Sequence, residues 1–270
     1  MKTPSGAAIV SQPASPTSPD MTRPRCFLSR SQQIKYLLFG GKSYARLRAR
    51  RMARRGEAEM KLLPFLVDPQ RNAVDVGANK GTYTIALSQL CRKVYSYEPN
   101  PGMRWILGKL SGNNVVISPK AVCDSIGRSV LRIPSQGGVK SNNVGSLRTT
   151  ALADSTIAVE VETTTLDNEN LVDVGFMKID VEGLEQEVLK GARSLIQRDR
   201  PVLLVEIIEE HTGRDVDETI ALIESWGYDT LVVRDGLLVS KTPGDGCLTG
   251  PDRGRNAKKR HRNFIFLPRQ

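Results

Sequence analysis

Acidic side chains follow two apolar runs in the second half of the chain. In the run Phe176-Met-Lys-Ile-Asp-Val-Glu-Gly, Asp180 follows the apolar residues directly and Glu182 lies two residues further on. Glu206 ends the next apolar run, and His211 follows five residues later. Carboxylates beside a ligand cleft orient an amine, hold a cation or remove a proton from a hydroxyl, and a His beside them is suited to act as acid or base. Glu182 has an alternative role as the acidic cap of a following helix.

A glycine turn and a later acidic residue are typical of a nucleoside site. Asp75 and Gly77 stand in Val-Asp-Val-Gly-Ala-Asn-Lys-Gly, where a strand turns into a helix and glycine lets a ligand approach the backbone. The spacing is neither the GxGxxG of dinucleotide folds nor a phosphate loop, which disfavours a diphosphate ligand. Glu98 follows Gly77 by 21 residues and ends the next apolar run, where a carboxylate suits ribose hydroxyls. The same residues are also compatible with a purely structural turn and a surface glutamate that bind no ligand.

Short apolar runs alternate with helical segments from residue 72 onward, and these elements must position the acidic residues. Strands are expected at 72–76, 93–98, 115–122, 129–133, 160–165, 176–180, 201–206 and 263–267, with a hairpin over 228–240 turning at Asp235-Gly236. Helices are expected at 81–90, 103–110, 183–196 and 217–226. This alternation predicts an α/β fold with a doubly wound, mostly parallel sheet. Ligands bind at the carboxyl ends of such strands, so the residues that follow the strands should carry the chemistry.

The composition excludes several classes of protein. The chain has 270 residues, enough for one large domain or two small ones. Its four Cys show no CxxC spacing and its two His are isolated, so neither a disulfide framework nor a metal site is expected. There is no apolar run of 18 residues, and Pro and polar residues occupy the place of the apolar stretch of a secretory signal. We therefore expect a cytoplasmic protein.

The net charge of +10 is unevenly distributed along the chain. Residues 1–61 hold 13 Lys and Arg against 3 Asp and Glu, residues 62–250 hold 19 against 25, and residues 251–270 hold 7 against 1. Residues 1–33 are rich in Pro, Ser and Thr and are expected to be a disordered tail. Residues 34–61 are expected to form a basic helical arm, and residues 62–270 the folded domain. The arm is either a solvated helix or a surface that meets anionic lipid or nucleic acid.

The motifs DVGANKGTYT, YSYEPNP, AVCDSIG, TTTLD, FMKIDVEGLEQEVLKGA, RPVLLVEI and NFIFLP occur in an order and spacing that resembles the FkbM family of S-adenosylmethionine-dependent methyltransferases. The resemblance covers about residues 58–268. It implies a class I methyltransferase (Rossmann-like) fold of seven strands, the last one antiparallel, with S-adenosyl-L-methionine as cofactor. It also implies a role for six residues. Asp75, Gly77, Asn79 and Gly81 would form the turn on the methionine side, Glu98 would take the ribose hydroxyls, and Asp124 would lie near the adenine.

The resemblance also implies the class of reaction. Family members O-methylate hydroxyls of sugars, glycolipids or polyketides, and Asp180 and Glu182 would face the sulfonium and the acceptor. The segment 141–147 would line the acceptor site. Because a neutral hydroxyl is a poor nucleophile, we expect a base, Asp180 or His211, with Glu182 and Glu206 as orienting groups.

Two other functions are kept as alternatives. The basic ends suit an RNA or DNA methyltransferase, although EPNP is not the motif of amino-methylating enzymes and 5% aromatic residues give few platforms for stacking bases. A non-catalytic protein that binds S-adenosylmethionine is the second alternative. The basic arm would contact nucleic acid under the first alternative, or hold the protein at the inner face of an anionic membrane near a lipid-linked acceptor.

Overall fold

The computed structural model describes residues 57–134, 156–209, 215–242 and 263–270. Several expectations fall outside these ranges: the disordered tail, most of the basic arm, the loop 141–147 and His211. Within the ranges, none of the helices is long and apolar enough to cross a membrane.

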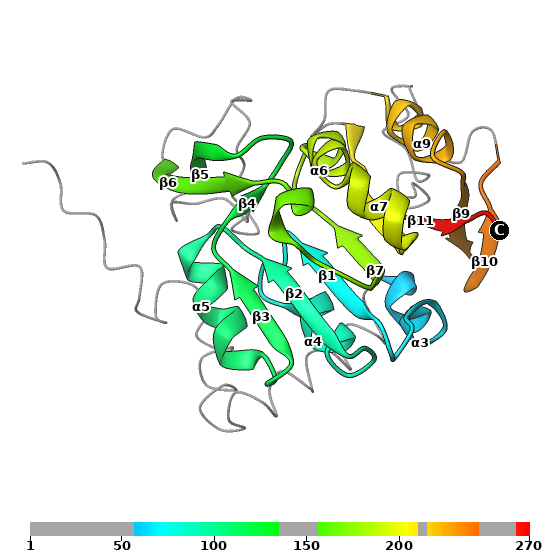
Figure 1. Ribbon diagram of the computed structural model, residues 1–270, viewed down its shortest axis with the longest axis horizontal. Coiled ribbons are helices and arrows are strands. Elements are labelled where there is room, and N and C mark those ends of the chain that lie inside the picture. The colour runs from blue at the N-terminus through cyan, green and yellow to red at the C-terminus, as the bar shows by residue number, and fades with distance from the viewer. Residues whose placement is uncertain (1–56, 135–155, 210–214, 243–262) are drawn as a thin grey trace, which may run out of the picture.

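An eight-stranded sheet forms the centre of the molecule, in the order β10-β9-β11-β8-β7-β1-β2-β3 (Figure 1). Six of its strands run in one direction, while β11 is antiparallel to both β8 and β9, and β10 is antiparallel to β9. This confirms the mostly parallel sheet with an antiparallel last strand. The strands are β1 Asn72–Val76, β2 Lys93–Tyr97, β3 Val115–Ser118, β7 Val174–Ile179, β8 Val202–Glu206, β9 Tyr228–Arg234, β10 Leu237–Ser240 and β11 Asn263–Pro268.

The expected count of seven strands is wrong by one. Asp235 and Gly236 both have positive φ and close a two-residue turn between β9 and β10. Such a turn matches the twist of a hairpin, so the chain returns along β9 and adds β10 as an edge strand.

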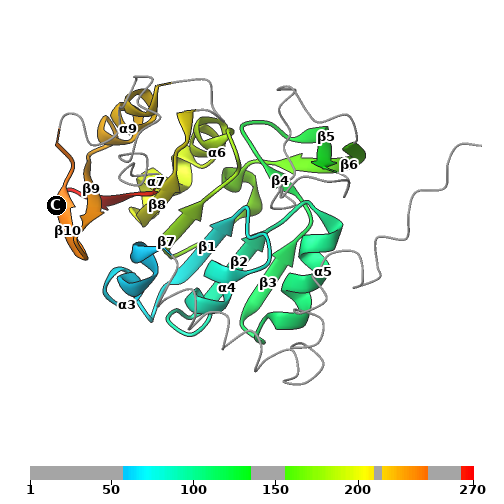
Figure 2. The same ribbon diagram turned by 180° about the vertical axis from the view of Figure 1, so that it is seen from behind.

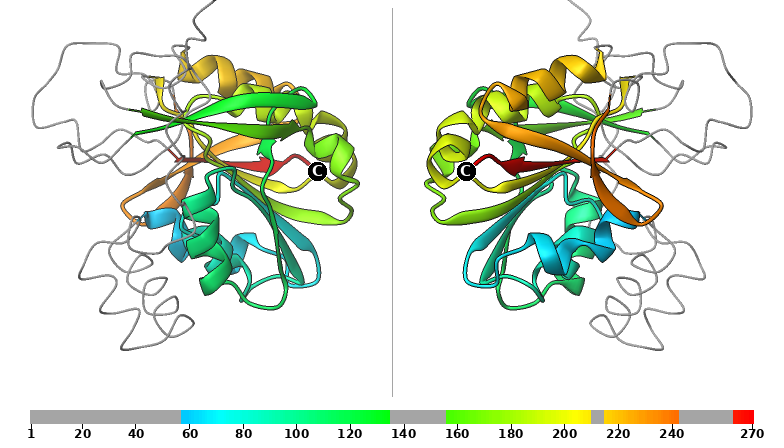
Figure 3. Two further views of the ribbon diagram at one scale, coloured as in Figure 1. Left: turned by 90° about the vertical axis from the view of Figure 1, so that its left-hand side faces the viewer. Right: turned by 90° about the vertical axis from the view of Figure 1, so that its right-hand side faces the viewer.

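Helices cover both faces of the sheet (Figure 3). One face packs on α6 Glu185–Gly191, α7 Arg193–Asp199 and α9 Val216–Glu224 through a core that includes Val74, Met177 and Val205. The opposite face packs on α3 Leu63–Leu66 and α4 Thr82–Leu87, where Ala73, Phe176 and Leu204 are buried. Alternate residues of β1, β7 and β8 therefore enter different cores, as expected for strands buried on both sides.

The single helix expected over 183–196 is wrong, because α6 ends and α7 begins on either side of Ala192. Gly191 packs against the backbone of Cys123: a Cβ placed on Gly191 would be 2.1 Å from the Cys123 carbonyl oxygen. The Asp167 carboxylate accepts hydrogen bonds from the amides of Ser194 and Leu195 and so caps the second helix separately.

A second, three-stranded sheet in the order β4-β6-β5 lies at the end of the large sheet opposite β10 (Figure 2). Its strands are β4 Ala121–Val122, β5 Gly127–Pro134 and β6 Thr156–Thr164. The expected strand region 115–122 is therefore divided between the two sheets, β3 belonging to one and β4 to the other. The helix α5 Pro101–Leu110 connects β2 to β3, and the short helices η2 Ala58–Lys61 and η3 Leu166–Glu169 complete the described elements.

Candidate active site

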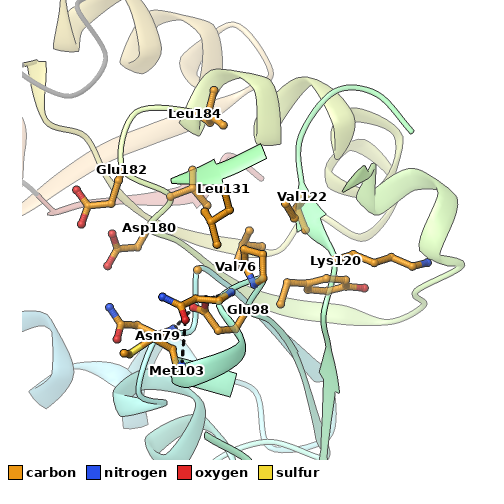
Figure 4. A pocket seen from close by; sticks show the side chains of 16 residues that line it. Val76, Asn79, Glu98, Met103, Lys120, Val122, Leu131, Asp180, Glu182 and Leu184 are labelled. Carbon is orange, nitrogen blue, oxygen red and sulfur yellow. Dashed lines mark hydrogen bonds between the residues drawn. The ribbon is translucent and has the colours of Figure 1, made fainter. Parts of the chain in front are cut away.

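A pocket opens at the carboxyl ends of β1, β2 and β7 (Figure 4). Asp180, Glu182 and Asn79 lie at one end, Lys120 lies at the other, and Glu98 lies between them. The pocket is therefore where the topology of a parallel sheet predicts a ligand site, outside the carboxyl ends of its strands.

The turn after β1 forms the floor of the pocket and packs directly on the turn after β7. Gly77 has φ of 80°, and a Cβ placed on it would be 1.8 Å from the carbonyl oxygen of Asp180. Asn79, two residues on, also has positive φ, at 49°. Only a glycine fits at position 77, because a side chain would collide with the neighbouring backbone and the left-handed conformation is unfavourable for other residues.

Glu98 is held rigidly in the middle of the pocket. One carboxylate oxygen accepts the Asn79 amide at 2.6 Å and the other accepts the Asn100 amide at 2.7 Å. Burial raises the pKa of Glu98 to about 7, and the two backbone hydrogen bonds oppose that shift. Because each oxygen accepts only one of these hydrogen bonds, each keeps a lone pair for a ligand hydroxyl.

Asn100 combines a structural bond with an unpaired donor. Its side-chain oxygen accepts the amides of Gly102 and Met103 and caps α5, which fixes the orientation of the amide group. Its Nδ2 is buried without a hydrogen-bond partner, and the residue lines the pocket. An unpaired buried donor costs about 1–3 kcal/mol, which a ligand acceptor would offset.

Asp75 and Gly81 support the pocket from below and are not among its lining residues. The Asp75 carboxylate is buried and accepts a hydrogen bond from the Thr84 hydroxyl, which ties β1 to α4. Burial raises the pKa of Asp75 to about 6. Gly81 begins α4 at positive φ, and a Cβ there would be 2.4 Å from Leu107 Cδ1.

The loop after β7 carries Asp180 and Glu182 to the pocket. Glu182 has φ of 55°, so the chain turns sharply there before α6. The carboxylate that bonds the loop ahead of α6 belongs to Glu185, which accepts the Gly183 amide at 2.9 Å. The side chains of Asp180 and Glu182 point toward the same end of the pocket (Figure 4).

Glu206 lies next to Asp180, at the end of the neighbouring strand. Its carboxyl group lies within hydrogen-bonding reach of that of Asp180, and burial together with the Asp180 charge raises the pKa of Glu206 to about 8. The sequence-predicted residues Asp180 and Glu206 are therefore brought together.

At the opposite end of the pocket the lining changes from carboxylates to apolar side chains. Val122 and Leu131 come from the small sheet and cover this end, while Lys120 forms an ion pair with Glu169 at 3.0 Å. Asp124 is exposed and is not among the lining residues, although it follows Val122 by only two positions. The structure thus brings the small sheet to this end but leaves Asp124 outside it.

Two residues that the sequence interpretation did not select lie at the site. Asn100 stands in EPNP, where an Asn before a Pro is a recognisable helix start. The sequence does not show, however, that its buried Nδ2 lacks a partner at a pocket. Lys178 stands in KIDVEG and is 1% exposed inside β7. A charged residue within an otherwise apolar strand was the available signal.

Comparison with known proteins places the chain in a family. The model of the methyltransferase FkbM domain matches residues 75–230, which is more than half of the chain. A search of curated proteins gave no match.

Several solved structures resemble this one. The FkbM methyltransferase from Methylobacillus flagellatus KT is 15% identical with a TM-score of 0.47, and the match covers 92% of this chain and 58% of that one. A precorrin 8W decarboxylase from Methanobacterium thermoautotrophicum is 15% identical with a TM-score of 0.42, covering 77% and 88% of the two chains. An rRNA methylase from Streptococcus thermophilus is 11% identical with a TM-score of 0.40, covering 78% and 95%. On the match of the family model, the chain belongs to the FkbM family of methyltransferases.

Proposed function

We propose that this methyltransferase uses S-adenosyl-L-methionine to O-methylate a hydroxyl of a sugar, a glycolipid or a polyketide-like molecule. The observation that carries the proposal is the pair of adjacent carboxyl groups, Asp180 and Glu206, beside a pocket with a third carboxyl group, Glu98, at its middle. A hydroxyl acceptor needs a group that takes its proton, and carboxylates also accept hydrogen bonds from neighbouring hydroxyls.

The residues of the pocket fit the proposed cofactor. Glu98 has a free lone pair on each oxygen for the ribose hydroxyls, and Asn100 Nδ2 supplies the buried donor that lacks a partner. The backbone at Gly77 and Asn79 would pass close to the methionine portion, and Val122 and Leu131 offer apolar contacts to the base. Asp75 and Gly81 act indirectly, because they hold the turn and α4 in place.

The reaction divides between the cofactor and the chain. When bound, S-adenosylmethionine supplies a methyl group whose bond to sulfur breaks, with the electron pair left on sulfur, as the acceptor oxygen forms the new bond to carbon. Asp180 accepts the proton of the hydroxyl, while Glu182 and Glu206 orient the acceptor. His211 stays a candidate base from the sequence, since it lies outside the described residues.

Calorimetry and product identification test this function. We expect S-adenosylmethionine to bind, and label from its methyl group to appear as a methyl ether in a fraction of glycans, glycolipids or polyketides from cell extract. An absence of binding at millimolar cofactor would reject the cofactor. Label found on RNA, on DNA or on nitrogen would reject O-methylation of a small acceptor while leaving the cofactor in place.

A further inference from the structure

Lys178 is an ammonium buried in the middle of the central sheet. It lies on β7, is 1% exposed, and its Nζ donates a hydrogen bond to Asn263 Oδ1 at 3.1 Å. Nζ also lies 3.9 Å from Asp180 Oδ2 and 5.1 Å from the centre of the Tyr83 ring. Removing an ammonium from water costs several kcal/mol unless it is paired, and an apolar side chain would fill this strand position without that cost.

The position of Lys178 follows from the register of four strands. Lys178 is aligned with Asp75 on β1 and with Leu204 on β8, and Asn263 on β11 is aligned with Glu206. Residues two apart on a strand share a face, so Lys178 lies on the same side as Asp180 and one step below the carboxyl end of the sheet. The ammonium therefore sits beneath the carboxyl pair at the end of the pocket.

Carboxyl groups outnumber this ammonium in its surroundings. Asp75, Asp180 and Glu206 approach it from the strands, and Glu57 and Glu59 approach from the segment that enters the domain. Tyr83, from α4, and Asn263 both donate hydrogen bonds to the Glu57 carboxylate. One positive charge does not balance this set, and burial together with the Asp180 charge raises the pKa of Glu206.

We propose that Lys178, Asp180 and Glu206 form one unit in which Glu206 keeps its proton and donates it in a hydrogen bond to Asp180, while Lys178 holds the Asp180 carboxylate oriented toward the acceptor. Lys178 is then a positioning residue, and Glu206 is a hydrogen-bond donor rather than a second base. The proposal rests on the proposed methyl transfer, in which the acceptor proton passes to the Asp180 carboxylate. This role would explain why β7 carries the buried Lys178 ammonium, which the fold alone does not require.

The first test measures the protonation of Glu206 without any methyl transfer. Carbon-13 NMR of cofactor-free protein labelled at its Glu and Asp carboxyl carbons should show a glutamate that titrates near pH 8, and this signal should vanish in Glu206→Gln. A second glutamate titrating near pH 7 is expected from Glu98 and should persist in that variant. A spectrum in which every carboxyl signal that Glu206→Gln removes titrates below pH 6 would overturn the proposal, whether or not the protein methylates a hydroxyl.

The second test is the dependence of turnover on pH. In the wild-type protein kcat should fall above about pH 8 as Glu206 loses its proton. Glu206→Gln keeps a donor at every pH, so whatever activity remains should no longer decline above pH 8. A Glu206→Gln profile with the wild-type decline would contradict the assigned role of Glu206.

The third test removes the ammonium. Lys178→Met should lower kcat at least tenfold, with cofactor affinity changed less than twofold, and Lys178→Arg should restore part of the lost kcat. Asn263→Ala, which removes one partner of Nζ, should lower kcat with the same small change in cofactor affinity and serves if Lys178→Met does not fold. Thr219→Val, at a buried hydroxyl on α9, controls for lost stability and should keep the wild-type kcat. A wild-type kcat in both Lys178→Met and Asn263→Ala would leave Lys178 with a purely structural role.

Discussion

Gly77 and Asp180 belong to neighbouring strand ends, and their backbones are in contact at the floor of the pocket. A Cβ on Gly77 would be 1.8 Å from the Asp180 carbonyl oxygen, far inside any tolerated contact. The turn that would hold the cofactor and the loop that carries the proposed base are therefore fixed relative to each other. A shift of one must move the other, because neither backbone has room to adjust independently.

Gly77→Ala should damage both the fold and the pocket. The added methyl group forces the two turns apart, and we expect a loss of about 2–4 kcal/mol in the free energy of unfolding together with loss of cofactor binding. Chemical denaturation and calorimetry measure the two effects. Gly236→Ala is the matched control, because Gly236 has nearly the same φ, 81°, with no atom within 4 Å of the added carbon. The control should cost about 1 kcal/mol and bind cofactor normally; equal losses in the two variants would refute the importance of the contact.

The affinity for the cofactor should rise with pH through the titration of Glu98. Burial raises the pKa of this carboxyl to about 7, and its ionised form is the better acceptor for ribose hydroxyls. Binding at pH 6 should therefore be about tenfold weaker than at pH 8. Calorimetry with Glu98→Gln should give weaker binding at pH 8 and little difference between the two pH values. Equal affinities of the wild-type protein at pH 6 and pH 8 would show that Glu98 does not accept the ligand.

Substitution of Asn100 separates the capping of α5 from the binding of a ligand. Asn100→Ser keeps a side-chain oxygen for the cap but removes the unpaired Nδ2, so we expect cofactor affinity to fall about tenfold with little change in thermal stability. Asn100→Ala should lose the cap as well and lower the melting temperature. Thermal denaturation and calorimetry on both variants provide the comparison. Wild-type affinity in Asn100→Ser would mean that Nδ2 does not face the ligand.

Glu206 should make stability depend on pH. Its pKa in the folded protein is about 8 against an ordinary 4.5, so folded molecules hold a proton that unfolded molecules have released. The stability that this proton provides is complete below about pH 4.5 and is lost as the pH rises to about 8. Relative to the wild-type protein, Glu206→Gln should therefore become more stable as pH rises from 5 to 8, by about 1–3 kcal/mol at pH 8.5. Urea denaturation at several pH values measures the difference, and the exposed Glu162→Gln should show no such trend.

The sequence pattern predicted the elements that depend on local residue order. The strand ends bearing Asp180, Glu98 and Glu206 follow from apolar runs, and the Asp235-Gly236 turn follows from residue types that accept positive φ. These features are set within a few residues, so a single sequence carries their signal.

Features that depend on distant contacts were not predicted. The break at Ala192 arises because Gly191 packs on the Cys123 carbonyl and Asp167 caps α7, and both partners lie more than 20 residues away along the chain. The buried environment of Lys178 likewise depends on Asn263, 85 residues later. Neither the division of residues 115–122 between two sheets nor the exposure of Asp124 has a signal in local composition.

The place of β11 has a consequence for how the protein is made. This strand follows all other described strands in the chain, yet it lies inside the sheet between β8 and β9, and its first residue, Asn263, bonds the Lys178 ammonium. While the ribosome is still adding residues before 263, β8 and β9 have no strand between them and the ammonium lacks this partner. The hairpin of β9 and β10 cannot join the sheet until β11 has been synthesised. A nascent chain therefore exposes an apolar edge of β8 and another of β9 until residues 263–268 emerge, and Lys178 gains its Asn263 partner only then.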